Sequence, residues 1–213
     1  MTLEETLAPT DLIDADVFRL LSACFYQPEK ELLAEERVCE NLAAAVNKIF
    51  PQATENARDL ISALRASSEQ ELLIDYARLL VGPFEPLAYP YGSVYLDGQK
   101  VVMGDSTLAV KELYAEHGME LADDFHEMPD HIAVELEFLY LLCFRAQQAR
   151  LADDAATLSK IKKTRRDFLT RHLGQWISTF AGKVQEQAQT DFYRLLASLC
   201  EQCVKAQMEL DSR

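Results

Sequence analysis

The sequence predicts an all-α protein. Only seven glycines and seven prolines occur among 213 residues, while Ala, Leu, Glu and Gln, which favour helices, are abundant. Apolar residues recur at spacings of three and four along most of the chain, as they do on one face of a helix. We therefore expect a single-domain helical bundle over residues 1–213, interrupted by one long central connection rich in Pro, Gly and aromatic residues.

Proline and capping residues predict where the helices begin and end. Pro28 and Pro51 should end the first two helices, because proline has no amide hydrogen and clashes with the preceding turn. Ser68 and Glu71 have the spacing of a capping box, which starts another helix. The predicted helices cover residues 12–25, 29–50, 57–64, 69–80, 106–118, 130–150, 154–172, 175–188 and 191–210.

The central connection covers residues 82–100, GPFEPLAYPYGSVYLDGQK. Long loops in compact helical proteins are often functional, so its aromatic residues either contact a ligand or form a lid on the core. Asp105 or Ser106 can cap the next helix, and Gly118 can end it in the left-handed conformation. Pro129 fits the first turn of the helix over 130–150.

The charge and the hydropathy pattern exclude several classes of protein. A net charge of −14 disfavours nucleic acid and favours a cationic partner. The acidic start of the chain lacks the basic and apolar regions of a secretory signal. No apolar run approaches the roughly 20 residues that span a bilayer. We expect a cytoplasmic protein without stable membrane insertion.

The five cysteines are predicted to be reduced residues of the core. They lie within apolar helical patterns, and an odd number argues against a disulfide framework. Cys200 and Cys203 have the spacing of a metal or redox pair, but no second pair completes four ligands. The pattern favours packing over chemistry.

Histidines and acids around residue 130 suggest a metal site only in part. His126 and His131 are five apart with Pro129 between them, whereas the zinc protease motif needs four. His131 and Glu135 are four apart, which leaves a metal-dependent helical-bundle enzyme as an alternative, although the second Glu-x-x-His pair is missing. The usual nucleotide, phosphate and hydrolase motifs are absent, so we expect no catalytic residue, no metal and no cofactor.

Four motifs in order carry a resemblance to a known family. They are YARLLVGP from Tyr76, PYGSVY from Pro90, GDSTL from Gly104, and PDH from Pro129, which leads into ELEF at 135–138. In this order and spacing the chain resembles the TorD/DmsD/NarJ family of redox-enzyme maturation chaperones. The resemblance covers nearly the whole chain.

The resemblance implies a function that composition alone does not. Members of this family are all-α cytoplasmic chaperones, not enzymes, which bind the twin-arginine signal peptide of a molybdenum-containing oxidoreductase and assist its maturation before export. The implied partners are this signal peptide and the apo form of the molybdoenzyme, and the implied state is a monomer or a dimer. An assembly subunit that recognises no signal peptide is a further alternative.

The resemblance also implies a signal-peptide site. The matching positions are Arg19, Tyr26, Tyr76, Leu79, Leu80, Phe84, Pro90, Tyr91, Gly104, Asp130 and His131. Tyr91 stands where tryptophan is common in the family, and Leu80 where phenylalanine is common. An aromatic groove with an acidic rim suits a peptide that is basic first and apolar after.

Three of these residues are expected to meet at the client site. Asp130 would engage a cationic or hydrogen-bond-donating part of the client, His131 would supply a donor or an acceptor, and Tyr91 would form an apolar wall. The alternative for Asp130 is that it only caps its helix.

Overall fold

The computed structural model describes residues 9–82, 84–98, 102–121 and 126–212, with side chains from Ala15 onward. These residues form eleven α-helices and no β-strand, which confirms the all-α prediction. The helices are α1 (Pro9–Phe25), α2 (Lys30–Glu35), α3 (Val38–Ile49), α4 (Thr54–Ala66), α5 (Glu69–Tyr76), α6 (Ser93–Leu96), α7 (Asp105–Glu116), α8 (Ile132–Leu151), α9 (Ala155–Arg171), α10 (Leu173–Gln187) and α11 (Asp191–Asp211). A 3₁₀ turn, Pro51–Ala53, precedes α4, and a π-helical turn, Ala77–Val81, continues α5.

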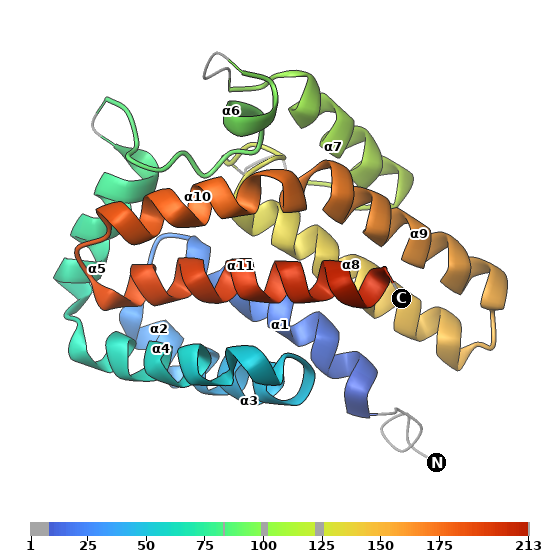
Figure 1. The fold of residues 1–213 in the computed structure, drawn as a ribbon, viewed down its shortest axis with the longest axis horizontal. Helices are drawn as coiled ribbons and strands as arrows, with labels where there is room; N and C mark the ends of the chain where they lie inside the picture. The colour runs from blue at the N-terminus through green and yellow to red at the C-terminus, as the bar shows by residue number, and fades with distance from the viewer. Residues whose placement is uncertain (1–8, 83, 99–101, 122–125, 213) are drawn as a thin grey trace.

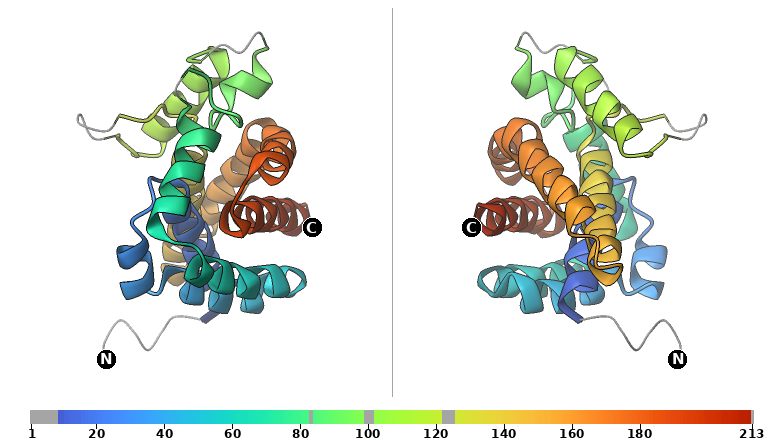
Figure 2. Two further views of the ribbon diagram at one scale, coloured as in Figure 1. Left: turned by 90° about the vertical axis from the view of Figure 1, so that its left-hand side faces the viewer. Right: turned by 90° about the vertical axis from the view of Figure 1, so that its right-hand side faces the viewer.

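Two helix pairs organise the bundle. α1 packs against α8, and α10 packs against α11 (Figure 1). α3 and α4 contact each other and cover α1 and α11, respectively, on one side. On the other side α6 and α7 lie outside the bundle, with α6 against α10 (Figure 2).

Large aromatic side chains fill the centre of the bundle. Phe138 of α8 contacts Phe168 of α9 edge to face with ring centroids 5.1 Å apart, and Trp176 contacts Phe180 within α10 at 5.5 Å. All four side chains are fully buried. Burial of each such side chain contributes about 1.5–3 kcal/mol, so this core holds the elements that carry the site.

The single helix predicted over residues 29–50 is wrong. The structure has α2 and α3, joined at Arg37, whose φ of 52° is left-handed. Leu33 and Val38 are both buried although they are five residues apart. One continuous helix would turn them about 140° away from each other, so the break lets both face the core.

Other predicted boundaries are confirmed or moved by one to three residues, when the π-helical turn is counted with α5. The capping box is present, since Ser68 N donates to Glu71 Oε2 over 2.7 Å and Glu71 N donates to Ser68 Oγ over 3.2 Å. Gly118 has the left-handed φ of 57° expected after a helix end. The cap predicted for α7 is different: Ser106 N donates to Asp97, a residue nine positions earlier.

α8 begins later than predicted, and its cap is not Asp130. The helix starts at Ile132, and the N-cap is His131, whose Nδ1 accepts a hydrogen bond from Ala133 N over 3.1 Å. Pro129 therefore precedes the helix and does not lie in its first turn. The interpretation of Asp130 as a simple helix cap is wrong.

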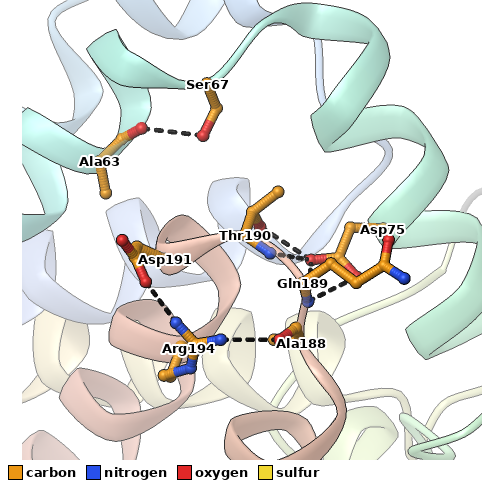
Figure 3. A network of polar contacts seen from close by, with 8 residues as sticks. All are labelled: Ala63, Ser67, Asp75, Ala188, Gln189, Thr190, Asp191 and Arg194. Carbon is orange, nitrogen blue, oxygen red and sulfur yellow. Dashed lines mark hydrogen bonds and ion pairs between the residues drawn. The ribbon is translucent and has the colours of Figure 1, made fainter.

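A buried carboxylate joins α5 to the start of α11 (Figure 3). Asp75 is 1% exposed and accepts hydrogen bonds from the backbone amides of Gln189 and Thr190 and from the Thr190 hydroxyl, at 2.8–3.2 Å. Arg78 Nη1 donates to the same carboxylate over 2.9 Å. We refer to these four residues as the Asp75 node, which caps α11 from a distant part of the chain.

The five cysteines are buried and free, as predicted. Burial raises the pKa of the Cys203 thiol, and together with the neighbouring Cys203 it also raises the pKa of Cys200, so both stay protonated. Within the described residues, no group of three or more His, Cys, Asp or Glu is arranged to hold a metal ion. No helix in the described part of the chain has the length and apolar character that crossing a membrane requires.

Candidate functional site

The central connection and the start of α8 are joined through their backbones. Gly92 N donates to the Asp130 carbonyl over 2.9 Å, and Ile132 N donates to the Pro90 carbonyl over 2.8 Å. These two bonds form an isolated antiparallel bridge between Tyr91 and His131. Two of the sequence motifs, separated by about 40 residues, are thus brought together as predicted.

Side chains from three other segments lie around His131, and Glu137 of α8 binds one of them. The Tyr91 ring stands edge-on to the imidazole at 5.4 Å, and the Tyr26 ring at the end of α1 stacks on it at 6.2 Å. Tyr91 Oη donates to Glu127 Oε2 over 2.9 Å, and Tyr26 Oη donates to Glu137 Oε1 over 2.8 Å. We refer to these five residues as the His131 cluster.

His131 is a neutral, fixed imidazole. It is 1% exposed, and burial lowers its pKa from 6.5 to about 3. Because Nδ1 accepts from Ala133 N, the proton is on Nε2, which lies 4.0 Å from Glu127 Oε2. The ring offers an apolar surface and one N–H, and it carries no charge at neutral pH.

Two further acidic residues, Asp130 and Glu135, are buried next to the cluster. Asp130 is 1% exposed, and its Oδ2 accepts from Ser93 N over 2.8 Å. Glu135 is fully buried, and its Oε2 accepts from Trp176 Nε1 over 3.2 Å. Burial first, and the charge of Asp130 second, raise the pKa of Glu135, so this side chain is a neutral acid.

Asp130 holds the connection in place from inside. Its bond to Ser93 N fixes the turn that follows Tyr91, and Gly92 allows that turn to approach closely, since a Cβ there would lie 3.0 Å from Trp176 Nε1. Asp130 Oδ1 and Glu135 Oε1 have no hydrogen-bond partner among the described residues. The expected contact of Asp130 with a cationic client would require this turn to move.

A groove between α1 and the α2–α3 segment adjoins the cluster. It has a volume of about 490 Å³, and Tyr26 is one of its walls. Leu20, Leu32 and Leu33 give it apolar surface, and Glu29 and Glu36 add acidic groups. Arg19 lines the same groove and pairs with Asp16 over 3.2 Å. We refer to this as the α1–α2 groove.

The remaining predicted residues are divided between core and surface. Tyr76 is close to Glu127 of the cluster. Burial first, and the charge of Glu127 second, raise the pKa of Tyr76 to about 12. Leu79 and Leu80 are buried in the core, and Phe84 is 98% exposed. Gly104 lies against the Asp97 side chain at the start of α7.

Two residues of the cluster were missed as site residues. Glu127 and Glu137 accept the hydrogen bonds of the two tyrosines, and Glu137 is 111 positions from its partner Tyr26. Local spacing cannot indicate a partner at that separation. For Glu127 the local sequence offers one signal, its spacing of four residues from His131.

Comparison with known proteins identifies the family. The model of the nitrate reductase delta subunit family matches residues 39–182, which is more than half of the chain. The chain belongs to this family. The matched region contains the Tyr76, Tyr91, Glu127, His131 and Glu137 positions described above.

Named relatives agree with this assignment. Chaperone protein TorD of Vibrio cholerae serotype O1 is 26% identical over 196 residues, covering 87% of this chain and 86% of the relative. Tat proofreading chaperone DmsD of Salmonella typhimurium is 27% identical over 181 residues, covering 85% and 82%. These relatives are chaperones, which supports the prediction of a maturation chaperone and not an enzyme.

A solved structure shares the fold. The crystal structure of a redox enzyme maturation protein from Archaeoglobus fulgidus superposes with a TM-score of 0.54 at 24% identity, and the match covers 88% of this chain and 91% of that one. The all-helical architecture is therefore shared with this solved structure.

Proposed function

We propose that this protein is a cytoplasmic chaperone that binds the twin-arginine signal peptide of a molybdenum-containing oxidoreductase and assists its maturation before export. The observation that carries the proposal is the continuity, at Tyr26, of the His131 cluster with the α1–α2 groove. The names of the TorD and DmsD relatives support the same function.

The chemistry of this surface suits both parts of such a peptide. Its apolar, helix-prone part can bury side chains against Leu32 and the Tyr26 ring, at about 25 cal/mol for each Å² of apolar surface removed from water. Its basic part can approach Glu29 and Glu36 on the groove wall. Apolar burial would supply most of the affinity, and charge would mainly increase the association rate.

The neutral state of His131 decides how the site recognises charge. Since the imidazole is uncharged at neutral pH, it does not repel a basic peptide, and its ring keeps both tyrosines in position. Recognition of the arginines then depends on carboxylates, of which Glu127 is half-buried beside Tyr91. A carboxylate favours arginine over lysine, because the planar guanidinium group can form two hydrogen bonds with it.

A second candidate is an assembly subunit that binds a catalytic subunit without recognising a signal peptide. The description of the matching family model as a nitrate reductase delta subunit favours it. Affinity purification from the native cell, followed by mass spectrometry, should first identify the molybdoenzyme that the protein retains. The test then compares capture of that precursor with capture of the same polypeptide lacking its signal peptide.

The two candidates predict different outcomes of this capture experiment. Signal-peptide recognition predicts that removal of the peptide reduces capture at least tenfold. Equal capture of both forms would contradict the proposal and favour the assembly subunit. Retention of no molybdoenzyme precursor would contradict both.

A further inference from the structure

The α9 helix is basic in a chain that is strongly acidic. Six of the 21 lysines and arginines lie within residues 160–171, while the whole chain has a net charge of −14. Asp167 is the one acidic residue in that range. This local reversal of charge has no part in the His131 cluster or the α1–α2 groove, none of whose residues lies on α9.

Part of this charge stabilises the fold. Arg165 forms an ion pair with Asp211 at the end of α11, and Arg166 Nε donates to the Asp211 carbonyl over 2.7 Å. Phe168 and Leu169 are buried on the inner side of α9. The helix is thus firmly attached to the bundle through its inner face.

The outer face of α9 carries the remaining cations. Lys160, Lys162, Lys163 and Arg171 are exposed, and α9 lies on the outside of the molecule beside α8 (Figure 2, right). Lys163 pairs with Asp167, but within the described residues no ion pair engages Lys160, Lys162 or Arg171. Lys160 and Arg171 lie on the same side of the helix, about 17 Å apart along its axis at 1.5 Å per residue.

A groove continues this face toward α7. It has a volume of about 490 Å³, and Lys160 and Arg145 are among its walls, with Ile161 and Ala149 as apolar lining and Glu116 and Asp154 as its acids. The pKa of His117 in this groove is lowered, first by burial and then by the charges of Lys160 and Arg145. A concave surface beside a row of cations can receive a polypeptide side chain as well as its charge.

We propose that the outer face of α9 binds an acidic segment of a partner polypeptide. This surface is separate from the proposed signal-peptide site. Its length matches about five residues of extended chain or about three turns of helix. Charge complementarity is local, because charges farther than about 8 Å are largely screened at physiological ionic strength. The net charge of the chain therefore does not prevent docking of a short acidic segment.

Other anionic partners fit this face less well. A membrane-surface helix inserts an apolar face into lipid, but the apolar face of α9 is buried in the bundle, and none of the exposed large apolar residues described lies on this helix. Single-stranded nucleic acid needs exposed aromatic rings for stacking, and Phe168, the aromatic residue of α9, is buried. A long duplex would extend beyond the patch over acidic surface.

The test measures binding of a fluorescent twelve-residue peptide, in which six glutamates alternate with serine, to the full-length protein in 150 mM NaCl. The variant Lys160→Glu/Lys163→Glu/Arg171→Glu is compared with Lys48→Glu/Arg58→Glu/Lys111→Glu, which changes three exposed cations on other helices and has the same net charge. We expect the α9 variant to lose at least tenfold in affinity and the control to lose less than threefold. The neutral variant Lys160→Gln/Lys163→Gln/Arg171→Gln should also weaken binding. It replaces the glutamate variant in the comparison if that variant does not fold.

Several results would overturn the proposal. These are absence of peptide binding to the wild type, an equal loss in both charge-matched variants, or tighter binding of phosphatidylserine vesicles or of a 20-base-pair DNA duplex than of the peptide. Salt-sensitive dimerisation that depends on α9 would instead assign the face to a second copy of the chain. Signal-peptide affinity is measured in parallel, and it should be unchanged in the α9 variant; its loss there would contradict two separate surfaces.

Discussion

Two buried aspartates, Asp75 before the central connection and Asp130 after it, differ in how many hydrogen bonds their carboxylate oxygens accept. Asp75 has both carboxylate oxygens engaged by Arg78, Gln189 and Thr190. Asp130 is equally buried, yet it has one bond, to Ser93 N, and its Oδ1 has no partner among the described residues. The many bonds of Asp75 suit an anchor between α5 and α11. The single bond of Asp130 means that the turn at the candidate site can move with the loss of fewer hydrogen bonds.

The largest effect is expected at the Asp75 node. Asp75→Ala leaves two backbone amides, a hydroxyl and Arg78 without their acceptor, which should lower the free energy of unfolding by about 3 kcal/mol. Asp75→Asn keeps one acceptor oxygen and should lose less. Urea unfolding measures both. A loss below about 1 kcal/mol for the alanine variant would show that the node is not an anchor.

The Asp130 region should instead show a dependence on pH. Glu135 has a pKa raised above 4.5 in the folded state, so the folded protein holds a proton that the unfolded chain releases. Stability from this group is fully present below pH 4.5 and falls as pH rises, by at most about 1.4 kcal/mol per pH unit. Glu135→Gln, which keeps an acceptor for Trp176, should remove that fall.

Unfolding measured from pH 4.5 to 8 checks this prediction. The stability of Glu135→Gln relative to the wild type should increase with pH. Glu186→Gln, at an exposed position, is the matched control and should show no such trend. A constant difference between Glu135→Gln and the wild type would mean that Glu135 is ionised in the folded state.

His131 should give the opposite slope. Its pKa is about 3 in the folded state and 6.5 ordinarily, so the unfolded chain binds more protons between these values. Stability from His131 is therefore present above pH 6.5 and is lost as pH falls toward 3. His131→Asn, whose side chain can still cap α8, should reduce this loss in acid unfolding. An unchanged acid transition would contradict the neutral imidazole.

The smallest effect is expected at the rim of the cluster. Tyr91→Phe removes the bond to the half-buried Glu127 while it keeps the ring against His131. We expect a loss of about 1 kcal/mol in thermal or urea unfolding. A loss as large as that of Asp75→Ala would remove the contrast between the two regions.

Sequence reasoning predicted the helices well and the polar contacts poorly. Periodicity and local caps, such as Ser68 with Glu71, depend on neighbouring residues, and these predictions are confirmed. The break at Arg37 was missed because the apolar pattern on each side is itself helical. The family resemblance led to the prediction that Tyr91 and His131 meet, but not that His131 is the cap.

The rest could not be predicted because it depends on distant partners. Glu137 and Tyr26 are 111 positions apart, and Asp75 and Thr190 are 115 apart. Only packing brings these pairs together. Helical spacing does place Leu79 and Leu80 toward the core, but no local pattern indicates that the apolar Phe84, close by in sequence, faces solvent.

Calorimetric titration tests the central claim most directly. The full-length protein is titrated with the twin-arginine signal peptide of the molybdoenzyme that it retains in the native cell. Wild type, Tyr26→Ala and Tyr91→Ala are compared with Phe144→Ala, which removes a half-buried ring thirteen residues along α8 from His131. We predict a negative heat-capacity change for the wild type, at least tenfold weaker binding for both tyrosine variants with folding retained, and less than twofold change for Phe144→Ala. Equal affinity in all four proteins, or no binding to the folded wild type, would contradict the account.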